Sequence, residues 1–178
     1  MIVKIEFIYA RDDKNGIAKN GNMPWNCPKD LKRFAKITKE NCKAKKRIPK
    51  AAVLMGRKTW DSLNKKFKPL PNRTNIILSR STKTHYGDDE KEIIYFSQSP
   101  EDCKSFLNRN CFTKVFVIGG AEIFKLFEKQ VSVVHESHIF GDFDCDITFS
   151  FDLKGFSPEV VEELDDHKYT LWRKNDSL

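Results

Sequence analysis

The sequence predicts an α/β fold, in which a mainly parallel central sheet of about eight strands has an antiparallel C-terminal edge and is flanked by helices. Strand-like and helix-like segments alternate up to about residue 130, as in successive right-handed βαβ units. The rest of the chain is rich in strands, and an antiparallel edge on a parallel sheet is a common arrangement. No linker rich in Pro, Gly and Ser divides the chain, so we expect a single domain over residues 1–178.

The expected strands are short runs rich in apolar and β-branched residues. A fully apolar run such as Val53-Leu54-Met55 is typical of a strand that is covered on both faces of a sheet. The polar, glycine-bearing stretch 11–22 is expected to be a loop. By these criteria we expect strands over residues 3–10, 51–55, 75–79, 93–96, 114–118, 131–139, 156–161 and 169–173.

The expected helices are marked by apolar spacing or by capping residues. Leu31, Phe34 and Ile37 recur at helical spacing. Ser99 is suited to cap a helix, Pro100 is suited to its first position, and acidic residues follow. We therefore expect one helix from Pro100 onward, and others over residues 29–37, 58–63 and 121–128.

The composition excludes several classes of protein. Apolar residues make up 39% of the chain and include 14 phenylalanines, enough for a core, so intrinsic disorder is excluded. No apolar run reaches the length of a membrane span, and Lys4 and Glu6 interrupt the stretch that a signal peptide would need. The five cysteines form no CxxC pair, which favours reduced thiols and a cytoplasmic location.

The histidines give no zinc-binding pattern. His135 and His138 are three residues apart, whereas a helical HExxH site needs a spacing of four. The simpler interpretation is a pair of histidines at the end of a strand. We therefore expect no metal site.

The basic balance of the chain, +7 with a pI near 9.1, has two possible origins. Residues 43–47 hold four Lys or Arg, a pattern that favours a nucleic-acid or nuclear-import segment, or simply a solvated surface loop. The remaining cations of interest follow predicted strands. Net charge alone therefore does not identify a partner.

Three strand ends carry residues that suit phosphate groups. Gly56-Arg57-Lys58-Thr59, Ser79-Arg80-Ser81 and Gly119-Gly120-Ala121 each follow a predicted strand. In an open parallel sheet, ligands bind outside the carboxyl ends of the strands, where free backbone N–H groups and helix N-termini favour anions. These clusters together favour a ligand with several phosphates, such as a dinucleotide. The alternative is that the glycines only end strands and the cations are solvated; neither GxGxxG nor a P-loop is present.

Asp30 is the most suggestive carboxylate in the chain. It can be a first-turn acid that the helix dipole stabilises. It can equally be a lone acid in an apolar pocket, where it anchors an amidine-like group or supports proton transfer. Arg73, in a proline-rich loop, can hold a carboxylate or be solvated, and Trp25 can belong to the core or to a pocket wall.

Several segments of the chain, in order, resemble those of a known family. Residues 16–26, which contain Met23-Pro24-Trp25, resemble the mobile active-site loop of dihydrofolate reductases. Similar matches follow in the family's order, and the resemblance runs from about Ile5 to Tyr169. The matching segments are Asp30-Leu31 with Phe34, and residues 53–60, 69–73, 75–80 and 117–120.

The resemblance implies a function and a set of site residues. Members reduce 7,8-dihydrofolate to tetrahydrofolate with NADPH, passing a hydride to C6 while N5 gains a proton. Asp30 would bind the pterin and support protonation through water near Trp25, and Ser137, where threonine is usual, would keep a hydroxyl for Asp30. Arg73 would hold the glutamate tail. The other implied substrate-binding residues are Ile8, Leu31, Phe34, Leu63, Leu70 and Ile118.

The same resemblance assigns the cofactor NADPH. The cations near the adenosine end would favour its 2′-phosphate, and Gly119 and Gly120 would be joined by a cis peptide bond. A monomer, sensitivity to antifolate inhibitors, and no need for nucleic acid or membrane are also implied. The implied cofactor-binding residues are Ala10, Ile17, Asn22, Met23, Gly56, Arg57, Lys58, Thr59, Ser79, Arg80, Ser81, Gly119, Gly120, Ala121, Glu122, Ile123 and Phe124.

Several positions depart from the family pattern. Phe124 stands where tyrosine is usual, Ala18 replaces a glycine of the mobile loop, and Ile147 follows Asp146 where threonine is common. Ala121 and Tyr9 also differ, and residues 39–52 form a basic insertion. An inactive or divergent paralogue is therefore one alternative. The others are a deazaflavin- or riboflavin-pathway reductase, which would lack Asp30 and the Pro24-Trp25 loop, and a basic nucleic-acid-binding module.

Overall fold

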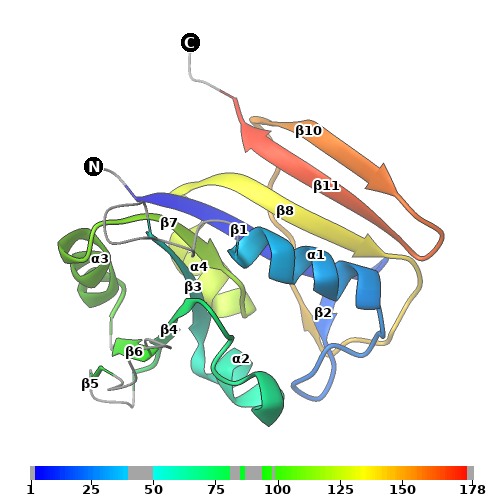
Figure 1. Cartoon of the computed structure of the whole chain (residues 1–178). Helices are drawn as coiled ribbons and strands as arrows, with labels where there is room; N and C mark the ends of the chain where they lie inside the picture. Colours follow the sequence, from blue (N-terminus) through cyan, green and yellow to red (C-terminus); the bar gives the residue numbers. More distant parts are fainter. Residues whose placement is uncertain (1–2, 40–49, 81–84, 87–93, 98, 176–178) are drawn as a thin grey trace.

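The computed structural model describes residues 3–39, 50–80, 85–86, 94–97 and 99–175 (Figure 1). The helices are α1 (Pro28–Lys39), α2 (Arg57–Ser62), α3 (Pro100–Arg109) and α4 (Ala121–Phe127), with a 3-10 turn η1 (Lys65–Phe67). The strands of the main sheet are β1 (Lys4–Arg11), β3 (Lys50–Gly56), β4 (Thr74–Leu78), β5 (His85–Tyr86), β6 (Ile94–Ser97), β7 (Phe112–Val117), β8 (Val131–Ile139), β10 (Phe156–Glu163) and β11 (His167–Lys174). A separate two-stranded sheet joins β2 (Gly16–Ala18) and β9 (Ile147–Thr148).

The main sheet confirms the predicted fold class. Its strand order is β10-β11-β8-β1-β7-β3-β4-β6-β5, and the six strands from β8 to β6 pair in parallel. Antiparallel pairing is found at the C-terminal edge, where β11 joins β8 and β10, and at the opposite edge, where β5 joins β6. All eight predicted strands are present, and β5 brings the described sheet to nine.

Three short strands were not predicted. β2 lies inside the stretch 11–22, so the prediction of an uninterrupted loop there was wrong. β2, β5 and β9 have two or three residues each, too few to produce a period-2 pattern in the sequence. The basic insertion expected at 39–52 falls largely on residues 40–49, which lie outside the described residues.

Helices cover both faces of the sheet. β3 shows the alternation: Val53 and Met55 pack in a cluster with Phe34 and Ile37 of α1, whereas Leu54 packs on the opposite face in a cluster that includes residues of α3 and α4. Figure 1 shows α1 lying across the sheet in front of β1 and β8. No helix among the described residues is long and apolar enough to cross a membrane.

The helix caps follow the sequence signals. The Ser99 hydroxyl accepts a hydrogen bond from the backbone N–H of Asp102 at 3.1 Å, and Pro100 occupies the first turn of α3, as predicted. α1 begins at Pro28 and carries Asp30 in its first turn. The side chain of Asp30 is only 14% exposed, which shows that it faces the sheet rather than the solvent.

A buried carboxylate on β1 joins three strands of the sheet. Glu6 is 4% exposed, and it accepts hydrogen bonds from Nε2 of His135 on β8 at 2.9 Å and from Nζ of Lys114 on β7 at 2.8 Å. Burial by itself raises the pKa of Glu6, but the bonds from His135 and Lys114 outweigh it and hold that pKa below its usual value of 4.5. The ionised carboxylate therefore stabilises the folded chain.

Replacing Glu6 tests this contribution. Because the pKa of Glu6 is lower in the folded than in the unfolded chain, its stabilisation is present above pH 4.5 and is lost as the pH falls through the folded-state value. We expect Glu6→Gln to lower the free energy of unfolding by about 1–3 kcal/mol at pH 7, and by less in acid. Urea denaturation at pH 7 and pH 4 measures both effects. The exposed Glu101→Gln is the control, and an equal loss at both pH values would contradict the prediction.

Candidate active site

The three predicted strand-end clusters lie side by side. β7, β3 and β4 are consecutive neighbours in the sheet, and all three run in parallel. Their carboxyl ends therefore meet at one edge, where Gly119-Gly120, Gly56-Arg57 and Ser79-Arg80 follow in that order. The register places Gly56 beside Leu78, directly before Ser79. A ligand at this edge can contact all three clusters.

The glycines at this edge leave room that a side chain would fill. The Gly119–Gly120 peptide bond is cis, as the family resemblance implied, and Gly119 has a φ of 129° that side-chain-bearing residues rarely adopt. A Cβ on Gly119 would lie 3.3 Å from Oγ1 of Thr59, and the Gly56 N–H donates to the Gly119 carbonyl at 2.8 Å. This bond joins the strand ends at Gly56 and Gly119. The backbone exposed between them carries no side chain, which fits the pyrophosphate of a dinucleotide.

The cations that were predicted to meet the adenosine end of the cofactor are exposed at this edge. Arg57 is exposed and its Nε donates to both oxygens of Asp61, at 3.1 and 3.0 Å, four residues along α2. Lys58 and Arg80 are exposed, and Ser79 is buried with its N–H donating to the Ser97 carbonyl at 2.8 Å. Ser81, which was also assigned to the cofactor, lies outside the described residues.

Five of the apolar residues assigned to substrate lie in or against one apolar cluster on the α1 face of the sheet. Ile8 and Leu70 are buried in it, while Phe34, Leu63 and Ile118 are half-buried against it. Half-buried apolar side chains at the margin of a core can still pack against a planar ring. Leu31 differs from the others, since it lies in the first turns of α1 and is 49% exposed.

Arg73 is buried and oriented by its neighbours. Its Nη1 donates to Oγ1 of Thr38 at 2.7 Å and its Nε donates to the Pro71 carbonyl at 3.1 Å. Its guanidinium carbon lies 5.9 Å from the centre of the Phe34 ring. A buried arginine held at two nitrogens is suited to bind a carboxylate, because its position is fixed before the ligand arrives.

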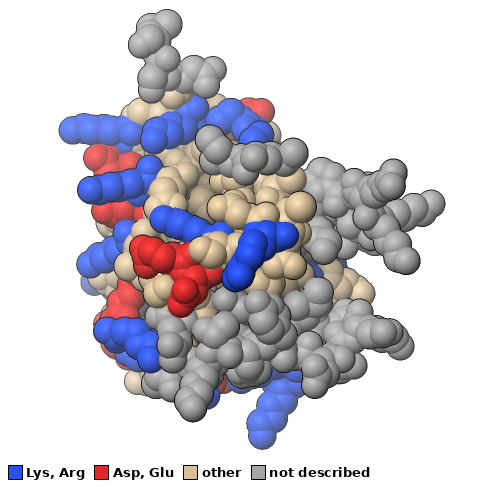
Figure 2. Space-filling model, turned by 90° about the vertical axis from the view of Figure 1, so that its left-hand side faces the viewer, with Lys and Arg blue, Asp and Glu red and all other residues tan. Residues whose placement is uncertain are grey.

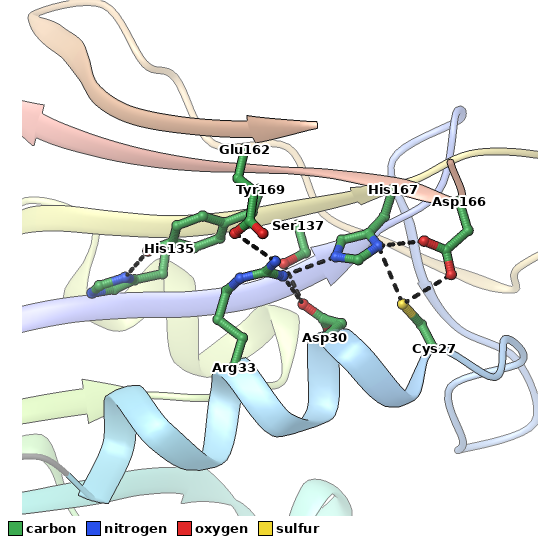
Figure 3. Close-up of polar contacts among 9 residues, drawn as sticks. All are labelled: Cys27, Asp30, Arg33, His135, Ser137, Glu162, Asp166, His167 and Tyr169. Atoms are coloured by element: carbon green, nitrogen blue, oxygen red, sulfur yellow. Dashed lines mark hydrogen bonds and ion pairs between the residues drawn. The ribbon is translucent and has the colours of Figure 1, made fainter. Parts of the chain in front are cut away.

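Asp30 is linked to the sheet and to a neighbouring cation (Figure 3). Its Oδ1 accepts a short hydrogen bond from the Ser137 hydroxyl of β8 and lies 3.6 Å from Nη1 of Arg33. The strand register places Ala10 of β1 directly beside Ser137. Asp30 therefore lies over the carboxyl ends of β1 and β8, and this contact supports the functional interpretation over that of a simple first-turn acid.

Arg33 joins Asp30 to a further set of polar groups. Its Nη1 lies 2.9 Å from Nε2 of His167, its Nη2 donates to Glu162 at 2.9 Å, and its guanidinium lies 4.7 Å from the centre of the Tyr169 ring. Burial raises the pKa of Tyr169 to about 12, so its hydroxyl stays protonated, and it lies 2.9 Å from Nδ1 of His135. Asp30 is thus the end of a continuous polar network.

The loop that precedes α1 is fixed by two carboxylates. Asp12 is buried and accepts backbone hydrogen bonds from Lys14, Gly16 and Phe143 at 2.9, 2.7 and 3.1 Å. Burial raises the pKa of Asp12, but these three bonds outweigh it and lower that pKa overall. The loop is thereby tied to the segment that follows β8.

The second carboxylate of this loop resolves one departure from the family pattern. Asp146 accepts from the Asn20 N–H at 2.8 Å and its own N–H donates to the Ala18 carbonyl at 3.0 Å. The contact is present although Ile147 replaces the usual threonine. Ala18 is accommodated within β2.

The remaining assigned residues divide by exposure. Trp25 is half-buried and packs edge-on against Phe143 at 5.5 Å. Phe124 is 1% exposed and stacks on Phe149 at 4.6 Å within an aromatic cluster, so its side chain belongs to the core. Ile123 is also buried, whereas Ile17 and Ala121 are half-buried, and Asn22, Met23 and Glu122 are exposed.

Three residues that position the site were not predicted. Arg33 follows Asp30 by three residues on a helix, a spacing that brings side chains together, so a charge-pair search would have found it. Thr38 is separated from Arg73 by 35 residues, and Asp12 acts through backbone groups. No short-range pattern marks either of them.

Comparisons with known proteins agree with this geometry. A model of the family described as dihydrofolate reductase matches residues 4–171. The dihydrofolate reductase of Candida albicans is 34% identical over 182 residues, covering 89% of this chain and 91% of the relative. A putative dihydrofolate reductase of Caenorhabditis elegans is 37% identical over 150 residues, covering 81% and 76%.

Other matches are to longer proteins and to a solved structure. Bifunctional dihydrofolate reductase-thymidylate synthase 2 of Arabidopsis thaliana is 36% identical over 147 residues; the match covers 79% of this chain but only 25% of that relative. The chain thus matches about a quarter of that protein's length. A dihydrofolate reductase from Enterococcus faecalis, complexed with NADP(H) and RAB-propyl, superimposes with a TM-score of 0.75 at 25% identity, with 97% of each chain covered. Since the family match spans nearly the whole fold, the chain belongs to the dihydrofolate reductase family of NADPH-dependent oxidoreductases.

Proposed function

We propose that this chain reduces 7,8-dihydrofolate to 5,6,7,8-tetrahydrofolate with NADPH. The observation that carries the proposal is the placement of Asp30, which is held by Ser137 over the ends of β1 and β8. A protected carboxylate at that point is the group that this reaction needs for binding the pterin and delivering a proton.

The residues on the α1 face bind and orient the substrate. The carboxylate of Asp30 can accept hydrogen bonds from the 2-amino and N3 groups of the pterin. The half-buried Phe34, Leu63 and Ile118 supply apolar surface for the rings. Arg73 is suited to the carboxylate of the glutamate tail, and it is the same α1 helix that places Asp30, Phe34 and Thr38, the residue that holds Arg73.

The strand-end residues hold the cofactor, which supplies the hydride when bound. The backbone at Gly119 and Gly120 fits its pyrophosphate because no side chain covers it, whereas the missing Cβ of Gly56 leaves room for the side chain of Ile123. Arg57 and its neighbours Lys58 and Arg80 supply positive charge for a 2′-phosphate. Ser137 and Arg33 hold Asp30 in place while it accepts and passes on a proton.

Phe124, together with Ala18, is a departure that raises the alternative of an inactive paralogue. It replaces a tyrosine whose hydroxyl would face the cofactor, yet in this fold Phe124 packs on Phe7, Tyr9 and Phe149. The hydroxyl in this cluster belongs instead to Tyr9, which donates to Glu136 at 3.0 Å. The substitution therefore leaves a filled core, and Asp30, Arg73 and the glycine pair are retained.

A nucleic-acid-binding function finds less support. Figure 2 shows Lys and Arg interleaved with Asp and Glu on the described part of one face, rather than gathered in a continuous basic surface. Single cations scattered among acids do not make the electrostatic footprint of a phosphate backbone.

We also propose that the protein acts in the cytoplasm as a monomer. Its five cysteines, which form no CxxC pair, support that location.

Oxidation of NADPH in the presence of dihydrofolate tests the proposed function. We expect the absorbance of NADPH to fall only when dihydrofolate is added to the purified chain, and a folate-analogue inhibitor to stop the reaction. No turnover under reducing conditions would refute the proposal in favour of an inactive paralogue. Turnover with a deazaflavin or riboflavin precursor instead would favour the other reductase class.

Asp30→Asn separates proton delivery from helix stabilisation. Loss of a positioned acid should lower hydride transfer by about 10²–10⁴-fold at neutral pH. The loss should be smaller in acid, where solvent can protonate the substrate. Pre-steady-state rates across the pH range measure both. Asp102→Asn, which removes a first-turn acid from α3, is the matched control, and equal behaviour of the two variants would make Asp30 a helix-stabilising acid only.

Arg57→Ala tests the assignment of the 2′-phosphate. A charge-assisted hydrogen bond contributes about 1.5–3 kcal/mol, so the preference for NADPH over NADH should fall roughly 10- to 100-fold. The ratio of kcat/KM for the two cofactors gives this directly. Arg109→Ala removes an exposed arginine from α3 and should leave the ratio unchanged. A ratio that is equally unaffected by Arg57→Ala would remove Arg57 from the cofactor site.

A further inference from the structure

Cys27, Asp166 and His167 form a cluster that the proposed reaction does not use. Cys27 immediately precedes α1, Asp166 immediately precedes β11, and His167 is the first residue of β11 (Figure 3). Sγ of Cys27 lies 3.4 Å from Nδ1 of His167 and 3.7 Å from Oδ2 of Asp166, and Nδ1 lies 2.7 Å from Oδ1 of Asp166. One ligand atom from each residue can be chosen so that all three lie within 4.8 Å of one another.

The geometry excludes a nucleophilic triad. In a relay, the thiol and the acid contact opposite nitrogens of the imidazole, so that the ring can pass a proton between them. Here the thiol and the carboxylate converge on the same nitrogen, Nδ1, while Nε2 faces Arg33 at 2.9 Å. Three potential ligand atoms close to one another are instead the arrangement that a metal ion requires.

The spacing and charge of the cluster select the kind of ion. Tetrahedral zinc bonds of about 2.0–2.3 Å place neighbouring ligand atoms roughly 3.3–3.7 Å apart, close to the two distances measured from Sγ. A thiolate and a carboxylate neutralise a divalent ion, and sulfur and imidazole ligands disfavour Mg²⁺ and Ca²⁺. We propose that Cys27, Asp166 and His167 bind one soft divalent cation of the zinc class, with solvent at the fourth position.

The site has a route to solvent. The side chain of Asp166 is 55% exposed, whereas that of His167 is 0% exposed and Cys27 is buried. An ion therefore enters past the carboxylate, and a water molecule can complete its coordination. Three protein ligands with one open position suit an exchangeable ion rather than one that is needed for folding.

Binding of the ion changes the protonation of His167. A guanidinium has only donors, so Nε2 accepts from Arg33 and Nδ1 carries the proton that it donates to Asp166. A metal on Nδ1 displaces that proton to Nε2, and the Cys27 thiol releases its own proton to solvent. One proton thus leaves per ion bound, and Nε2–H then faces the N–H of Arg33, so their hydrogen bond is lost.

The ion thereby acts on Asp30 through Arg33. When His167 no longer accepts, the acceptor that remains near Nη1 of Arg33 is Oδ1 of Asp30, at 3.6 Å. Arg33 then moves toward the carboxylate and competes with the pterin for it. This coupling rests on the proposed function, and it predicts that occupancy raises the KM for dihydrofolate, whereas binding of the ion itself does not depend on that function.

Cobalt binding tests the site without any assay of activity. Co²⁺ added to the purified full chain in a non-chelating buffer should give one equivalent of a tetrahedral spectrum with a thiolate charge-transfer band, which Zn²⁺ then displaces. Cys27→Ser should abolish that band, and Asp166→Asn should weaken binding at least about tenfold. Asp166→Asn changes an exposed side chain, so it remains informative if Cys27→Ser does not fold.

Matched controls exclude adventitious ligands. Asp165→Asn alters the exposed acid next to Asp166, and Cys111→Ser removes an exposed thiol elsewhere; both should bind Co²⁺ as the unaltered chain does. The proposed site would be overturned if the unaltered chain gave no thiolate band with Co²⁺. It would equally be overturned if the band persisted in Cys27→Ser.

Steady-state kinetics test the coupling. Zn²⁺ should raise the KM for dihydrofolate in the unaltered chain and in Asp165→Asn, and leave it unchanged in Cys27→Ser. An equal effect of Zn²⁺ on Cys27→Ser would overturn the coupling through Arg33. Absence of all dihydrofolate turnover would refute the proposed function, and the cobalt spectra would still decide whether the site binds a metal.

Discussion

The hydrogen bond from the Ser137 hydroxyl to Asp30 links the first turn of α1 to the sheet, and several of the predicted site residues lie on that same helix. Asp30, Phe34 and Thr38 are spaced four residues apart, so they lie along one face of α1. Once Asp30 is fixed on β8, Phe34 is directed into the apolar cluster and Thr38 onto Arg73. One helix face thus carries the acid, an apolar ring and the support of the arginine.

The opposite part of the site is set by strand order rather than by side-chain contacts. β7, β3 and β4 are neighbours, so clusters that are separated by up to 63 residues in sequence, from Gly56 to Gly119, meet at one edge. The Gly56 N–H to Gly119 carbonyl bond joins the first two directly. A surface assembled from three separate strand ends needs little from any single residue, which is why no short fingerprint motif marks it.

The sequence predicted those parts of the molecule that depend on local patterns. Apolar runs marked all eight long strands, and Ser99 with Pro100 marked the start of α3, because both signals act within a few residues. Residues that act across the fold gave no such signal: Thr38 supports Arg73, and Asp12 accepts from Phe143, 131 residues away. The two-residue strands β5 and β9 pair with β6 and β2, and runs of two residues are too short to carry a strand pattern in the sequence.

Arg33 shows how one residue can connect two chemically different sites. Its guanidinium donates toward Asp30, Glu162 and His167 and cannot accept a hydrogen bond, because it carries only N–H donors. That single property fixes the tautomer of His167, which in turn directs Nδ1–H toward Asp166 and lowers the pKa of that carboxyl. Asp30 also follows Cys27 by three residues and lies in the first turn of α1. The acid and the cysteine cluster are therefore joined twice, through the first turn of α1 and through Arg33, and a change of protonation in the cluster has a direct path to the carboxylate of Asp30.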